Sequence, residues 1–189
     1  MKHILASLLL ICFLITNINV VKAADTSDVD DVSKLYAIMV SEDTKEIIGN
    51  SIDFNKYGIQ NVDFGNGLSF KYESKKMEKL TLASTWKTVS DTMSGTFYKT
   101  SNNQTVARYS LAVTFQYNGS SVKTSDDNIQ VSCSSIPNWS VVDSYSISYP
   151  SSGCSVDATF DLYYDNQYNN QTFLDMACNV NGTITKTYE

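Results

Sequence analysis

Residues 109–122, YSLAVTFQYNGSSV, decide the fold class of this chain. Every second position is apolar or aromatic, which is the period of a β-strand with one buried face. These positions are Tyr109, Leu111, Val113, Phe115 and Tyr117. The run stops at Asn118-Gly119, a pair that favours a tight turn. The stretch therefore predicts a half-buried strand that ends in a hairpin turn.

The same pattern recurs through the C-terminal half of the chain. No helical period of useful length follows Leu80. Strands are predicted instead at 80–87, 94–100, 105–117, 128–134, 141–149, 154–164, 172–180 and 183–188. Such spacing, with Gly, Asn, Asp and Pro between the runs, is typical of a sandwich. We therefore predict an all-β fold, a mostly antiparallel, immunoglobulin-like β-sandwich, as a single domain over residues 34–189.

Residues 34–49, KLYAIMVSEDTKEIIG, allow two interpretations. Two apolar runs flank the polar residues 42–45, and this arrangement favours a hairpin. A helix over residues 28–41 is the rival, because Val29, Val32, Leu35, Tyr36 and Met39 recur at helical spacing. Residues 34–72 are expected either as a small N-terminal hairpin appendage or as the first strands of the same sandwich.

A second hairpin is predicted in residues 62–72, VDFGNGLSFKY. Apolar residues alternate on both sides of Gly65-Asn66-Gly67, and glycine supplies the positive φ that a tight hairpin turn needs. The charged residues 73–79, ESKKMEK, are expected to form a loop or a single helical turn.

The N-terminus predicts export from the cell. Lys2 precedes an apolar run over residues 4–15, and the small residues Ala23-Ala24 follow. This is the pattern of a secretory signal peptide, here residues 1–24. The apolar run is shorter than the roughly 20 residues that a membrane-spanning helix needs. We expect a secreted protein with no membrane span after signal cleavage, and a flexible acidic lead-in over residues 25–33.

The three cysteines outside the signal peptide, Cys133, Cys154 and Cys178, lie in the apolar alternation of three predicted strands. Their thiols are therefore expected to face the core. Exported proteins meet oxidising conditions, and three cysteines allow at most one internal disulfide. The sequence does not choose among the three pairs. Cys133 with Cys178 is our first guess, because strands that are distant in sequence often face each other across a sandwich.

Several chemistries are excluded by residue type. His3 is the only histidine and leaves with the signal peptide, so no imidazole remains for a nucleophile–histidine site or a histidine-bearing metal site. The net charge of −6 argues against nucleic acid, whose phosphates require clustered Lys and Arg. No glycine-rich phosphate loop is present. We expect no cofactor, no metal and no enzymatic activity.

The best candidate binding surface is the stretch 161–171, DLYYDNQYNNQ. Tyr163 should lie on the strand face opposite Phe160 and Leu162. With Tyr168 and nearby amides it would form a stacking platform with hydrogen-bonding groups, as in sugar-binding β-sandwiches. The candidate ligand-binding residues are Tyr163, Asn166, Tyr168 and Asn170. The competing interpretation is a polar hairpin loop in a chain that is rich in Tyr and Asn throughout.

Three segments carry a resemblance to known proteins: SGTFYKT at 94–100, VARYSLAVTFQYNGSSVK at 106–123 and CNVNGTITK at 178–186. A tryptophan lies between them in the segment 138–140. Over about residues 94–189 the chain resembles small exported proteins of clostridia and related Gram-positive bacteria, a group of unknown function. The resemblance implies an exported β-fold. A true immunoglobulin domain is not supported, because Trp139 follows Cys133 too closely.

These observations favour a secreted, non-catalytic binding or interaction protein at or outside the cell envelope. The sequence does not identify the ligand; an extracellular glycan and a surface protein are the two candidates. One alternative is a carbohydrate-binding module in the strict sense. Another is a small hydrolase that uses carboxylates, since two suitably spaced acidic side chains suffice for glycoside hydrolysis. The sequence does not single out such a pair.

Overall fold

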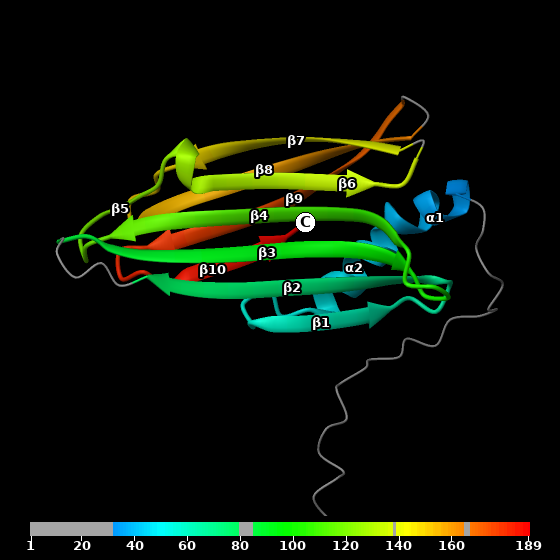
Figure 1. The fold of residues 1–189 in the computed structure, drawn as a ribbon, viewed down its shortest axis with the longest axis horizontal. Coiled ribbons are helices and arrows are strands. Elements are labelled where there is room, and N and C mark those ends of the chain that lie inside the picture. The colour runs from blue at the N-terminus through cyan, green and yellow to red at the C-terminus, as the bar shows by residue number, and fades with distance from the viewer. Residues whose placement is uncertain (1–31, 80–84, 138, 165–166) are drawn as a thin grey trace, which may run out of the picture.

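The computed structural model describes residues 32–79, 85–137, 139–164 and 167–189 of the chain. The predicted signal peptide (1–24) and most of the predicted lead-in (25–33) lie outside the described residues. Within them, the chain forms two antiparallel sheets of six and four strands packed face to face, with helices beside the smaller sheet (Figure 1). The all-β sandwich predicted from the alternation is confirmed.

The larger sheet, sheet A, has the strand order β1-β2-β3-β4-β5, and β6 also pairs with β4. Its strands are β1 (Gly58–Asp63), β2 (Leu68–Lys79), β3 (Lys87–Lys99), β4 (Thr105–Tyr117), β5 (Val122–Lys123) and β6 (Ile129–Ser135). The smaller sheet, sheet B, has the order β10-β9-β8-β7. Its strands are β7 (Trp139–Ser148), β8 (Gly153–Tyr164), β9 (Gln167–Asn179) and β10 (Ile184–Tyr188). A short 3₁₀ helix, η1 (Asp126–Asn128), precedes β6.

The opening stretch forms the centre of sheet A. Residues 109–117 belong to β4, which pairs with both β3 and β6, and all of its odd-numbered side chains from Tyr109 to Phe115 are buried. The chain then turns at Gly119, whose φ of +87° only glycine adopts without strain. The strand and the turn predicted here are confirmed.

The hairpin predicted at residues 62–72 is also confirmed. It joins β1 to β2, and Gly65 and Gly67 have φ of 72° and 86°. The loop predicted at residues 73–79 is wrong, since β2 continues to Lys79 and pairs with β3 throughout. Charged residues are compatible with this strand because Lys71, Glu73 and Lys75 alternate onto its solvent face, while Tyr72 and Ser74 are buried.

The hairpin predicted around residues 42–45 is wrong, and the rival helical interpretation holds over its described part. The chain forms α1 (Val32–Met39) and α2 (Glu42–Ser51). Ser41 separates them and caps α2, because its side-chain oxygen accepts a hydrogen bond from the backbone N–H of Thr44 at 3.2 Å. Glu42 and Asp43 in the first turn add favourable charge at the positive end of the helix.

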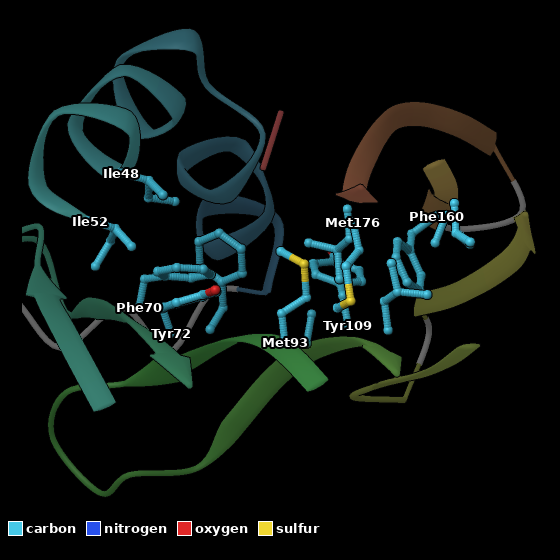
Figure 2. Packing of buried hydrophobic residues seen from close by; sticks show 14 of the residues in the cluster. Ile48, Ile52, Phe70, Tyr72, Met93, Tyr109, Phe160 and Met176 are labelled. Carbon is cyan, nitrogen blue, oxygen red and sulfur yellow. The ribbon is translucent and has the colours of Figure 1, made fainter. Parts of the chain in front are cut away.

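The helices complete the core. Sheet A is wider than sheet B, so β1 and β2 extend past the last strand of sheet B, and α2 covers their inner face. Figure 2 shows Ile48 of α2 and Ile52, the C-cap of that helix, directed toward Phe70 and Tyr72 of β2. Leu35, on α1, is completely buried in the same cluster. Residues 34–72 therefore contribute to the common core of the sandwich.

Shortening Ile48 tests this integration. We expect Ile48→Ala to lower the free energy of unfolding by about 2–5 kcal/mol, because it leaves a cavity between α2 and β2. Urea denaturation followed by near-ultraviolet circular dichroism measures the effect. Glu46→Ala, at an exposed position of the same helix, is the matched control and should change stability little. If Ile48→Ala left the sheet transition unchanged, the helices would be an independent appendage.

Candidate functional site

The two tyrosines singled out in the sequence meet on the outer face of sheet B. Tyr163 on β8 is the register partner of Tyr168 on β9. Their ring centroids lie 5.8 Å apart with an interplanar angle of 66°. Tyr168 is 55% exposed and Tyr163 is half-buried. The stretch predicted as a platform is thus largely strand, and its tyrosines form an exposed aromatic pair.

The neighbouring row of the sheet carries hydrogen-bonding groups. Gln171 on β9 faces Asp161 on β8, and its amide nitrogen donates to the Asp161 carboxylate at 2.7 Å. Asn170 is half-buried, and its side-chain oxygen accepts a hydrogen bond from the backbone N–H of Gln171 at 2.8 Å. Asn166, the fourth predicted ligand-binding residue, lies outside the described residues. The sequence did not identify Asp161 and Gln171 as a bonded pair.

A packed aromatic cluster supports the tyrosine pair from the inner side. Tyr164 points to the face opposite Tyr163 and stacks on Tyr36 of α1, with ring centroids 5.4 Å apart. Trp139 of β7 meets Tyr36 edge-on at 5.2 Å. Burial raises the pKa of the Tyr36 hydroxyl, and Tyr168 raises it further. The exposed tyrosines therefore rest on a rigid base that includes a helix far away in the sequence.

Two donors of this cluster lack hydrogen bonds. The Tyr36 hydroxyl and the Trp139 indole nitrogen are buried and have no hydrogen-bond partner among the described residues. An unpaired buried donor destabilises the folded state. A ligand acceptor that reached these groups would remove that penalty.

Farther along the outer face, two aspartates oppose each other. Asp157 on β8 is the register partner of Asp175 on β9, and Ser155 donates a hydrogen bond to Asp175 at 2.5 Å. Burial, with the neighbouring carboxyl group of Asp157, raises the pKa of Asp175 to about 6 against the lowering effect of Ser155. Ser155 also donates a hydrogen bond to Asp157 at 3.4 Å, so one hydroxyl group contacts both carboxyl groups.

The sequence missed this pair for a simple reason. Each aspartate alternates onto the solvent face of its strand, where an acidic residue needs no explanation. Only the register between β8 and β9 places the two side by side. Each aspartate directly follows a buried apolar residue of its strand, Val156 and Leu174. The sequence contains no other sign that the two lie together.

The three cysteines are free thiols. Cys154 and Cys178 are buried and are register partners on β8 and β9, whereas Cys133 is half-buried on β6. The first guess, Cys133 with Cys178, is not formed, because Cys178 faces its strand neighbour within sheet B. Burial raises the pKa of Cys178 to about 12. Burial and Asp143 raise the pKa of Cys133 to about 11. These thiols are poor nucleophiles at neutral pH.

Two searches of the described residues complete the description. They hold no group of three or more His, Cys, Asp or Glu side chains arranged to bind a metal ion. Within the same residues, every helix is too short or too polar to cross a membrane.

Comparison with protein-family models, with curated proteins and with solved structures finds no match for this chain. The resemblance to small exported proteins over residues 94–189 therefore stays a prediction.

The aspartate pair predicts a pH dependence of stability. Because the pKa of Asp175 lies at about 6, above its ordinary 3.8, the folded state binds more protons than the unfolded chain between these values. Its contribution to stability is therefore greatest at low pH and declines as pH rises through this window. Asp175→Asn removes this titration. The free energy of unfolding of the variant should therefore fall less between pH 4.5 and pH 7.5 than that of wild type.

Urea midpoints of both proteins at the two pH values measure this effect. Asp157→Asn should flatten the dependence in the same direction, since it removes the neighbouring acid. An Asp175→Asn variant that kept the full wild-type difference between pH 4.5 and pH 7.5 would contradict the raised pKa of Asp175.

Proposed function

We propose that this chain is an exported, non-catalytic binding protein that acts at or outside the cell envelope. The N-terminal pattern of residues 1–24 supports export. The ligand-binding surface in this proposal is the tyrosine end of the outer face of sheet B, formed by Tyr163, Tyr168, Asp161 and Gln171. The single observation that carries the proposal is the exposed Tyr163–Tyr168 pair.

The chemistry of this surface suits a glycan. A sugar ring presents a flat set of C–H groups that packs on an aromatic ring, and its hydroxyls both donate and accept hydrogen bonds. Tyr168 offers the exposed ring, while the bonded Asp161 and Gln171 offer an acceptor and an amide one row away. All of these residues are on paired strands, so binding would order few additional groups. A surface protein is the alternative ligand of the same face.

The aspartate pair supports the second candidate, a small carboxylate-dependent hydrolase. The two residues face each other on paired strands, and Ser155 donates a hydrogen bond to each carboxyl group. Two facing carboxyl groups can act as acid and base in a closed site. Here the pair lies on the outer face of a sheet, between short hydroxyl side chains such as Ser155 and Thr187.

Truncation of the exposed tyrosine tests the binding proposal. A panel of soluble bacterial and plant glycans is titrated while tyrosine and tryptophan fluorescence is followed. For a glycan that binds, Tyr168→Ala should weaken affinity about tenfold, the equivalent of roughly 1.4 kcal/mol of lost stacking. Tyr149→Ala is the matched control, because Tyr149 is 60% exposed beside the β7–β8 turn, away from this surface. It should leave the affinity unchanged.

Two outcomes would contradict the proposed binding function. Equal losses in Tyr168→Ala and Tyr149→Ala would mean that binding does not use the tyrosine end. Turnover of a glycan or protein substrate at pH 5–6, abolished by Asp175→Asn, would replace a binding role by a hydrolytic one.

A further inference from the structure

The core of the sandwich contains one group of polar side chains that the proposed function does not use. Lys186 of β10 and Asp91 of β3 lie on the inner faces of opposite sheets, and both side chains are completely buried. The lysine nitrogen Nζ lies 3.2 Å from Oδ2 of Asp91 and donates a hydrogen bond to the hydroxyl of buried Ser74 on β2.

The carboxyl group of Asp91 is held at both oxygens. Oδ1 accepts a hydrogen bond from the backbone N–H of Thr92 at 2.8 Å. Oδ2, the oxygen beside the lysine, also accepts from the Tyr57 hydroxyl at 3.0 Å. The ring of Tyr57 covers Lys186, with Nζ 4.1 Å from the ring centroid. Tyr57 itself is 44% exposed, so it contacts both the buried pair and solvent.

This arrangement has the components of an amide-forming reaction. An amine and a carboxyl group are fixed in contact, which replaces an encounter in solution by an effectively unimolecular step. One carboxyl oxygen faces a backbone N–H, which can stabilise negative charge as an oxyanion hole does. The other oxygen faces a hydroxyl proton donor. Burial disfavours the charged pair, and condensation would remove both charges from the apolar core.

We propose that Lys186 and Asp91 condense to an intramolecular amide that joins β10 to β3 across the sandwich. A proton passes from the lysine ammonium to the Asp91 carboxylate, giving a neutral amine and a neutral acid. Nζ then attacks Cγ of Asp91, and the new negative charge on Oδ1 is stabilised by the Thr92 N–H. Oδ2 takes a proton from the nitrogen, through Tyr57, and leaves as water. One C–N bond forms, one C–O bond breaks, and no oxidant is needed.

The bond would fix an edge strand of sheet B. β10 pairs with β9 alone, and its backbone N–H at Lys186 is bonded to the Asn55 side chain at 3.0 Å. A strand that is paired on one side only opens more easily than a central strand. A covalent link from β10 to β3 would hold the two sheets together independently of the noncovalent core. Such a link suits a protein that works outside the cell.

High-resolution intact mass of the purified full chain tests the proposal. The wild-type protein should be lighter than its sequence by the mass of one water molecule. The Asp91→Ala variant, prepared in the same way, should have its full sequence mass, which controls for N-terminal processing. After trypsin digestion, the wild type should yield a branched peptide that joins residues 88–99 to a C-terminal peptide uncleaved at Lys186.

Tyr57→Phe separates chemistry from packing, because it keeps the ring over Lys186 and removes only the hydroxyl. This variant should fold and should retain a larger uncondensed fraction than wild type. A wild-type chain that folds and keeps its full sequence mass after prolonged incubation overturns the proposal. Loss of water that persists in Asp91→Ala, or that maps to other residues, overturns it as well. None of these measurements depends on Tyr168, so their result is independent of the test of the glycan-binding face.

Discussion

The packing of a wide sheet on a narrow one determines the architecture of this protein. Within the described residues, six strands of sheet A face four of sheet B, so the inner side of β1 and β2 has no strand to cover it. An uncovered row with Phe70 and Tyr72 would expose a large apolar surface to water. Helix α2 fills the missing place with Ile48 and Ile52 (Figure 2). The N-terminal segment is therefore a structural part of the sandwich.

The same unequal packing explains the polar group in the core. The last strand of sheet B, β10, lies where the strand layer gives way to the helix and the loop that follows it (Figure 1). At this boundary Lys186 reaches Asp91 and Ser74, Asn55 satisfies the backbone of β10, and Tyr57 closes the site from outside. Such a boundary combines a fully buried ion pair with contact to the partly exposed Tyr57.

The two faces of sheet B carry different kinds of side chain. Its inner face packs the core with Phe160, Leu174 and Met176. Its outer face carries short hydroxyl side chains, the Asp157–Asp175 pair and the tyrosine pair. Because Tyr163 and Tyr164 are consecutive on one strand, Tyr163 contacts the exposed Tyr168 on the outer face while Tyr164 stacks on Tyr36 of α1. The proposed binding surface thus adjoins the core through one strand.

Alternation in the sequence determined the fold class, most of the strands from β4 onward, and the solvent-facing side of Tyr163, because side-chain direction in a strand has a period of two. Lys186 lies on the same strand face as Ile184 and Tyr188, but the alternation does not show which residue it meets. The alternation did not resolve the helices, since α1 and α2 are short and their apolar positions also fit a hairpin. The charged residues 73–79 led to the prediction of a loop. They belong to β2, because a strand with one solvent-exposed face accommodates charged side chains on that face.

Register and sheet packing were decided only by the tertiary structure. A strand pattern tells which residues share a face, and pairing tells which residues meet. The pairing of β8 with β9 brought Asp157 to Asp175, Cys154 to Cys178 and Tyr163 to Tyr168. The packing of sheet B on sheet A brought Lys186 to Asp91 over a separation of 95 residues. Contacts of this range depend on the whole core, so no local stretch of the sequence encodes them.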